Sequence, residues 1–250
     1  AAFLGLAIGD ALGATVEFMT PREIRQEFGV HCEIVGGGWL RLKPGQVTDD
    51  TTMSLALGEA ILAEGRVDAR AAAEAFDAWM RAKPVDIGNT VRRNLITYRK
   101  TGNPEAPASE HDAGNGAAMR ILPVALATLG QGREVLATAC RAQGHVTHHI
   151  ILSDAACIAL AGMVQDFVRG KSVEDVERAN AAPLVAVHPV FDYTVKPRDN
   201  PSGFVVETIQ AVLQALFATE TFEDCVVDVV NRGGDADTTG AIAGMLFGAL

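Results

Sequence analysis

Apolar positions along this chain recur mostly at the spacing of helices, and alternating Thr, Tyr and Phe positions are few. Ala, Leu and Val dominate the composition, which favours helices over strands. The pattern therefore predicts an all-α fold. We expect helices over residues 1–14, 53–64, 68–80, 91–98, 145–168, 172–180, 205–217, 222–230 and 238–250, and another that starts at residue 114 and ends near residue 123.

The first and last of these predicted helices carry glycine at every fourth position. Glycine weakens an isolated helix by roughly 1 kcal/mol relative to alanine. Three on one face therefore indicate that another backbone approaches closely. We expect the two helices to be neighbours at the centre of the fold. The glycines are Gly5, Gly9 and Gly13 in the first helix and Gly240, Gly244 and Gly248 in the last.

Turn signals separate the helices without dividing the chain into domains. Residues 28–48 contain three consecutive glycines and a Pro-Gly pair, which predict a long loop that shapes a pocket. Residues 189–201 predict a second irregular loop. No linker, low-complexity tract or repeat is present, so we expect one domain over residues 1–250. The chain starts without Met and ends inside a predicted helix, and we expect both ends to be trimmed.

The formal charge of −10 argues against binding to nucleic acid, because the 21 Lys and Arg residues are dispersed. The apolar N-terminal run has no basic start and contains Asp10, so it predicts a core helix instead of a signal peptide. No apolar run is both long and uncharged enough to span a bilayer. Four widely spaced cysteines form no metal or redox motif. We expect a cytoplasmic protein that is not integral to a membrane.

Two acidic clusters stand at the starts of predicted helices almost two hundred residues apart. Carboxylate and hydroxyl oxygens are the ligands that Mg²⁺ and Mn²⁺ prefer. Asp and Thr also cap helix N-termini without any metal, which is the alternative for either cluster alone. The pairing favours a cation, which relieves repulsion between close carboxylates. The first cluster is Thr48-Asp49-Asp50-Thr51-Thr52, and the second is Asp235-Ala236-Asp237-Thr238-Thr239.

Glu17 and Asp86 are further candidates for the site. Glu17 lies seven residues after Asp10 and would share its face if the helix continued, although a surface glutamate is the alternative. Asp86 precedes Gly88 and Asn89 at a polar helix entrance. Capping explains the asparagine, but it does not explain why Asp, Gly and Asn occur together.

Two other segments carry weaker signals. Gly114-Asn115-Gly116 would let backbone N–H groups approach a phosphate, although this sequence is also a common turn. His145 and His148 have a spacing that could bind zinc, but no third soft ligand is evident. Capping, packing or contact with a substrate explains the histidines better.

Together these segments resemble the ADP-ribosylglycohydrolase family, in the family's order and over nearly the whole chain. The resemblance implies an all-α, single-domain orthogonal helical bundle with two Mn²⁺ or Mg²⁺ ions at the bottom of an ADP-ribose cleft. The motifs that carry it are Gly9-Asp10-Ala11-Leu12-Gly13 with Glu17, Thr48-Asp49-Asp50-Thr51, Gly88-Asn89-Thr90, Gly114-Asn115-Gly116-Ala117-Ala118-Met119-Arg120 and Gly234-Asp235-Ala236-Asp237-Thr238.

The resemblance also implies roles for individual residues. Glu17 and Asp86 would position the reactants and transfer protons during hydrolysis of an N-glycosidic bond between ADP-ribose and arginine. The metal ligands would be Thr48, Asp49, Asp50, Asp235, Asp237 and Thr238. The substrate would contact Gly88, Asn89, Gly114, Asn115, Gly116, Met119, His145, Ser202 and Gly203. Phe204 departs from the tyrosine expected after Ser-Gly, which removes one hydroxyl contact.

Residues 83–90 and the histidine-rich segment 145–149 resemble the branch of the family that reactivates nitrogenase. That branch implies a protein substrate, the ADP-ribosylated iron protein of nitrogenase, and control by a PII-type signalling protein. Two other interpretations remain open. One is a hydrolase of serine-linked ADP-ribose or O-acetyl-ADP-ribose. The other is a catalytically silent ADP-ribose-binding regulator, which the intact acidic clusters disfavour.

Overall fold

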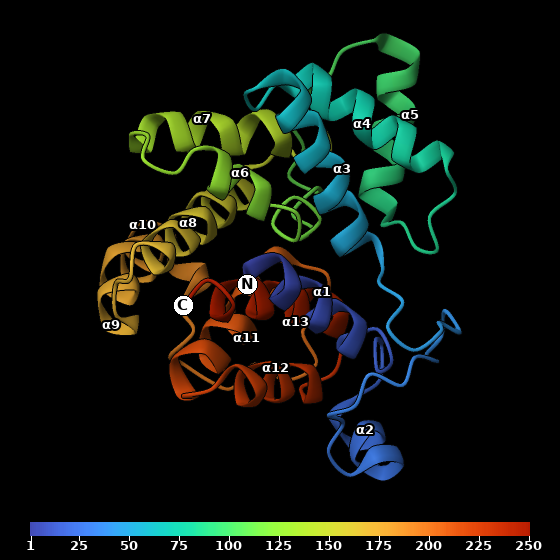
Figure 1. Ribbon diagram of the computed structural model, residues 1–250, viewed down its shortest axis with the longest axis vertical. Helices are drawn as coiled ribbons and strands as arrows, with labels where there is room; N and C mark the ends of the chain where they lie inside the picture. The colour runs from blue at the N-terminus through green and yellow to red at the C-terminus, as the bar shows by residue number, and fades with distance from the viewer.

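The computed structural model describes residues 1–250 and confirms the all-α prediction: the regular elements are helices joined by loops, and the β structure is limited to two isolated bridges. Figure 1 shows the arrangement. The α-helices are α1 (Ala2–Gly13), α2 (Pro21–Phe28), α3 (Asp49–Glu64), α4 (Ala69–Arg81), α5 (Asn89–Thr101), α6 (Leu122–Ala127), α7 (Arg133–Gly144), α8 (Ile151–Val168), α9 (Val173–Val176), α10 (Ala182–Val187), α11 (Val205–Ala218), α12 (Phe222–Asn231) and α13 (Ala236–Phe247).

Helices α1 and α13 form an antiparallel pair at the centre, as the glycine spacing predicts (Figure 1). A Cβ atom added to Gly9 would lie 1.9 Å from the carbonyl oxygen of Gly240. One added to Gly5 would lie 2.1 Å from the carbonyl oxygen of Gly244. No side chain fits at these distances, so the two backbones touch directly. The pair aligns the C-terminal end of α1 with the N-terminal end of α13.

The other helices surround this pair. Helices α11 and α12 pack against α13, while α3 contacts α1, α4 and α6. Helix α8 joins α6 and α7 to α11 and α13. Figure 1 shows α2 at the edge of the molecule, beside the long loop that leads to α3. One apolar cluster of 54 buried residues runs through the bundle from Ala2 to Leu246, so the site at its centre is held by a continuous core.

Two predicted helices differ from the structure. Residues 116–120 form turns, and α6 begins at Leu122, because Pro123 occupies the first turn of a helix instead of ending one. The helix expected over residues 145–168 begins only at Ile151. His145 caps the C-terminus of α7, a helix that the sequence pattern did not single out. The segment 145–150 therefore connects α7 to α8, and its residues 146–148 are buried.

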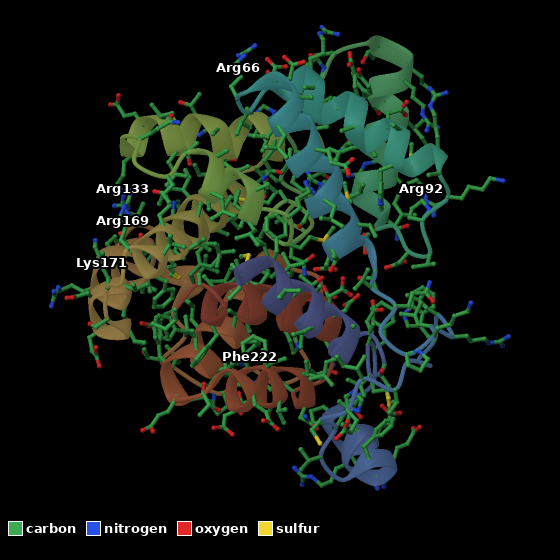
Figure 2. The ribbon with its side chains drawn as sticks, viewed as in Figure 1. Arg66, Arg92, Arg133, Arg169, Lys171 and Phe222 are labelled. Atoms are coloured by element: carbon green, nitrogen blue, oxygen red, sulfur yellow. The ribbon has the colours of Figure 1, made fainter.

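Helix α8 corrects the expectation that no segment is apolar enough for a bilayer. By length and composition Ile151–Val168 passes that test, but most of it is buried inside the protein. Core helices of water-soluble proteins have the same composition, so this single helix is weak evidence for a membrane span. Figure 2 shows the labelled basic side chains at the outside of different elements, which agrees with the dispersed charge read from the sequence: Arg66 after α3, Arg133 in α7, and Arg169 and Lys171 after α8.

Candidate active site

The two acidic clusters meet where the N-termini of α3 and α13 converge beside α1. The hydroxyl oxygen of Thr48 lies 3.2 Å from a carboxylate oxygen of Asp237, which is 189 residues away in the sequence. The hydroxyl of Thr238 donates to Asp50, also at 3.2 Å. The close packing of α1 on α13 and the contact of α1 with α3 bring these segments together. The clusters therefore form one site.

Asp10 of α1 holds the start of α3 in place through hydrogen bonds. Its carboxylate accepts hydrogen bonds from the backbone N–H and hydroxyl groups of both Thr48 and Thr51, at 2.5 to 3.1 Å. The side chain is fully buried, and burial raises its pKa despite these four donors. Asp10 belongs to the Gly9–Gly13 motif, but the sequence alone assigned it no role. Its position between the glycines that face α13 was the available signal.

Two groups of three carboxylates are arranged closely enough to hold a cation. Within each group the three oxygens lie within 4.8 Å of one another, and Asp237 belongs to both. One oxygen of Asp50, buried beside them, has no hydrogen-bond partner. The first group is Glu17, Asp235 and Asp237, and the second is Asp49, Asp86 and Asp237. Oxygen-only donors of this kind suit a hard divalent cation.

Electrostatics support the same conclusion. Burial, helped by neighbouring carboxylates, raises the pKa of Glu17 and of Asp49 to about 8. Burial followed by the same repulsion also raises the pKa values of Asp50 and Asp237 well above their ordinary range. Buried like charges are costly until protons or cations neutralise them. The acidic residues are therefore suited to hold a cation, and the carboxylates of Glu17 and Asp86 lie within 4.8 Å of that of Asp237.

Glu17 is held by an aromatic partner from the long loop. The indole N–H of Trp39 donates to its carboxylate at 2.7 Å. Trp39 also packs against Phe18, with ring centroids 5.4 Å apart, and both aromatic side chains are largely exposed. Phe18 has a φ of +66°, which is uncommon for a bulky residue, and its N–H bonds the carbonyl oxygen of Gly234 at 2.7 Å. The glycine turn before Asp235 thus fixes the chain that carries Glu17.

A cavity of about 540 Å³ opens above the carboxylates. This volume lies in the range of sites for small ligands. Arg92 of α5 is the one Arg or Lys that lines it, a residue the sequence analysis did not select. The predicted site residues that line the cavity are Glu17, Asp49, Asp86, Gly88, Asn89, Gly114, Asn115, Gly116, Met119, Gly203, Asp235, Asp237 and Thr238.

The Gly114–Gly116 loop is tied to the segment before α11. The N–H of Asn115 bonds the carbonyl oxygen of Gly203 at 3.0 Å, and the two segments form an isolated bridge at Gly114 and Phe204. The side-chain amide of Asn115 donates to Asp235 at 2.6 Å. This asparagine therefore links the cavity wall to the acidic cluster, beyond its expected place in a phosphate loop.

Four predicted site residues do not line the cavity. Thr48 and Asp50 lie buried among the carboxylates. Ser202 is exposed, and its hydroxyl bonds Glu207 at 2.7 Å. His145 instead binds Asp154 at 2.9 Å and stacks on His149.

His148 lines the cavity instead of His145. Because the segment is a connection between α7 and α8 and not the first turn of a helix, its side chains face different directions. Sequence spacing alone could not choose between the two histidines.

The site combines a dense carboxylate cluster, a cavity of ligand size and a glycine-rich wall on an all-helical frame, an arrangement that suits a hydrolase. The family model of ADP-ribosylglycohydrolase matches residues 1–250. The chain belongs to the ADP-ribosylglycohydrolase family and is a hydrolase of glycosidic bonds.

Individual relatives agree with the family assignment. The chain is 52% identical to an ADP-ribosyl-[dinitrogen reductase] glycohydrolase of Rhodospirillum rubrum, over 99% of this chain and 83% of that protein. It is 35% identical to the ADP-ribosylarginine hydrolase Tri1 of Serratia proteamaculans, over 99% of this chain and 70% of that protein. A solved ADP-ribosylglycohydrolase-related protein complex superposes with a TM-score of 0.85 at 36% identity, covering 99% of this chain and 85% of that one.

Proposed function

We propose that this protein removes ADP-ribose from an arginine side chain of a target protein, with residues 1–250 acting as one domain. The observation that carries the proposal is the placement of Glu17 and Asp86 in the same cavity as the two converged acidic clusters. Of the two named relatives described above, one is named for ADP-ribosylated dinitrogen reductase and the other for the arginine linkage.

Hydrolysis of this bond needs a proton for the departing guanidine and an activated water for the anomeric carbon. Glu17 suits proton transfer, because burial raises its pKa to about 8 and Trp39 holds one of its oxygens. Asp86 lies at the cavity edge and offers the guanidinium a charge-assisted, bidentate partner. Glu17 would thus exchange the proton while Asp86 orients the leaving group.

Two divalent cations, Mn²⁺ or Mg²⁺, are proposed for the two acidic clusters that meet at Asp237. They would supply positive charge that polarises water and the ribose hydroxyls. The holding residues would be Asp49, Asp50, Asp235 and Asp237, with the hydroxyls of Thr48 and Thr238 beside them, which leaves Glu17 and Asp86 for proton transfer and orientation. Arg92 at the cavity wall provides a cation for the diphosphate of ADP-ribose.

The proposed target is the iron protein of nitrogenase, modified on one arginine, in the cytoplasm. The 52% identity to the glycohydrolase named for dinitrogen reductase supports this target. The same resemblance supports a PII-type signalling protein as a regulatory partner. A folded protein substrate requires an accessible cavity mouth, and exposed Phe18, Trp39 and Asn89 provide one.

The test is incubation of ADP-ribosylated iron protein with the enzyme and Mn²⁺. We expect release of free ADP-ribose and recovery of iron-protein activity. Release from other arginine-modified proteins, but none from the iron protein, would contradict the target while preserving the reaction. The Asp235→Ala variant provides the inactive control, since it removes one carboxylate of the acidic cluster.

A further inference from the structure

Arg120 is a fully buried cation that has no carboxylate partner. Its guanidinium lies over the ring of Phe76, 4.2 Å from the centroid. Nε donates to the side-chain oxygen of Gln143 at 2.9 Å, and Nη2 donates to the carbonyl oxygen of Gln143 at 3.2 Å. Burial lowers the pKa of Arg120 to about 9, so it stays charged at neutral pH. A buried charge is costly unless hydrogen bonds and other contacts compensate for its lost hydration.

The same guanidinium fixes the direction of a hydrogen bond at Thr147. Nη2 of Arg120 donates to the Thr147 hydroxyl oxygen at 2.7 Å. An arginine has donors only, so the hydroxyl must accept this bond. Its own hydrogen has one acceptor, Nδ1 of His148, at 2.8 Å. If Nδ1 carried a proton, the buried hydroxyl would have no acceptor, which is costly.

The direction of the bond settles the protonation of His148. Nδ1 accepts, so the single proton of the neutral ring resides on Nε2. Nε2 has no acceptor within the protein. It lies against the wall of the cavity, 3.1 Å from where a Cβ atom of Gly114 would stand. Burial, and then the charges of Arg120 and Arg93, lower the pKa of His148 to about 3, which keeps the ring neutral.

We propose that Arg120 is a positioning residue that, through the Thr147 hydroxyl, holds His148 in one tautomer with its Nε2–H directed into the cavity. The proposal deepens the proposed function, on which it rests for the identity of the ligand. An N–H donor fixed in this way selects an oxygen acceptor, the kind of atom that ADP-ribose presents throughout its diphosphate and ribose groups. The glycines at 114 and 116 leave room for the ring, since a Cβ at Gly116 would lie 2.8 Å from its Cε1.

Thr147→Val tests the link because it keeps the shape and removes the hydroxyl. Thr147→Ser restores the hydroxyl and is the conservative rescue. Thr128→Val is the matched control: Thr128 is also buried, accepts from the amide of Gln165 at 3.0 Å and donates to the carbonyl oxygen of Val124 at 2.7 Å, far from the cavity. Because the control loses the same kind of bond, it separates general destabilisation from an effect on His148.

The direct measurement is ¹⁵N NMR of histidine-labelled protein, with His148 assigned by its absence in His148→Gln. In the parent protein we expect a bare Nδ1 that accepts a hydrogen bond and a protonated Nε2, unchanged between pH 5 and 8. Thr147→Val should shift the Nδ1 resonance, and Thr147→Ser and Thr128→Val should leave it in place. A proton on Nδ1 of the parent protein, or an Nδ1 resonance unmoved in Thr147→Val, would overturn the proposal.

Binding of ADP-ribose to the metal-loaded protein gives the second readout. We expect Thr147→Val to weaken binding about fivefold, the equivalent of one net hydrogen bond, with a smaller change in kcat. Thr147→Ser should bind within about twofold of the parent. Equal affinity in Thr147→Val and the parent would contradict the role of the link. Failure of the parent itself to bind ADP-ribose would refute the proposed function and leave the tautomer result standing, because the NMR measurement needs no ligand.

Discussion

At the scale of single residues, the site depends on side chains that hold the reacting groups in place. Glu17 has one fixed partner, the indole N–H of Trp39, and otherwise faces carboxylates that repel its charge. Removing that partner would free the carboxyl group to turn away from the cavity. The tilted aromatic contact with Phe18 would remain, so the loop itself should keep its place.

Trp39→Phe should therefore lower kcat about tenfold while affinity for ADP-ribose changes little. The reason is that a hydrogen bond to a charged or partly charged group contributes roughly 1.5–3 kcal/mol, of which proton transfer should lose a large part. Steady-state kinetics on an ADP-ribosylarginine substrate will measure this. A change confined to KM would assign Trp39 to substrate binding instead.

Asp86→Asn keeps the shape of the side chain and removes its charge. We expect kcat to fall at least about a hundredfold on arginine-linked substrate, because a charge-assisted bidentate contact to the guanidinium is lost. Binding of free ADP-ribose, which has no guanidinium, should be retained within a fewfold when measured by calorimetry. Unchanged turnover would mean that Asp86 only caps the entrance to α5.

At this scale the sequence singles out the carboxylates because there are two acidic clusters, whereas either cluster alone is also explained by helix capping. It could not choose between His145 and His148, which differ only in the direction set by the connection between α7 and α8. Nothing in the sequence indicated that Arg92 lines the cavity, since its position does not distinguish it from other exposed arginines on helices. The role of Asp10 required the contact between α1 and α3, which no local pattern reveals.

At the scale of elements, the glycine contacts between α1 and α13 determine where the two acidic clusters meet. Gly9→Ala would place a Cβ atom 1.9 Å from a backbone oxygen, and neither helix can move without shifting the site. We expect a loss of at least about 2 kcal/mol in unfolding free energy, as for other overpacked positions. Denaturant unfolding followed by circular dichroism will measure it.

Gly58→Ala is the matched control within α3. An added Cβ there would meet only a Pro123 side-chain atom at 3.7 Å, an ordinary contact. Because alanine favours helices, this variant should be as stable as the parent or up to about 1 kcal/mol more stable. Equal stability of the Gly9 and Gly58 variants would contradict the close packing of the central pair.

The packing of α1 on α13 was predictable because glycine at every fourth position leaves one helix face without side chains, which the sequence alone reveals. The first and last residues of the helices were harder to predict from the sequence. Pro123 was compatible with either end of a helix from its identity alone, and it proved to lie in the first turn of α6. Helix α2 is short and mostly exposed, with Ile24 its one buried residue, so it had little apolar pattern to detect.

At the scale of the whole molecule, the buried acids link stability to pH and metal. The pKa values of Glu17 and Asp49 rise to about 8 from ordinary values of 4.5 and 3.8. Between those limits the folded protein binds more protons than the unfolded chain, so the free energy of unfolding falls as pH rises. In a strong chelator, Tm should therefore be lower at pH 8 than at pH 5.5.

Added Mn²⁺ or Mg²⁺ should reverse this loss at pH 8, because a cation that binds only the folded site stabilises it by mass action. The recovery should be much smaller in Asp235→Ala. Thermal unfolding at both pH values, with and without metal, will measure these effects. If Tm in the presence of chelator were the same or higher at pH 8, ionisation of the buried carboxylates would not destabilise the fold.

The central claim is that this fold hydrolyses the bond between ADP-ribose and arginine. Its most direct test is release of ADP-ribose from defined arginine-linked, serine-linked and O-acetyl substrates, with Mn²⁺ and with chelator, using Asp235→Ala as the inactive control. We predict rapid, metal-dependent release from the arginine linkage and at least about a hundredfold slower release from the others. Preferential release from the serine-linked or O-acetyl substrate, or full activity on the arginine linkage in the chelator, would contradict the account.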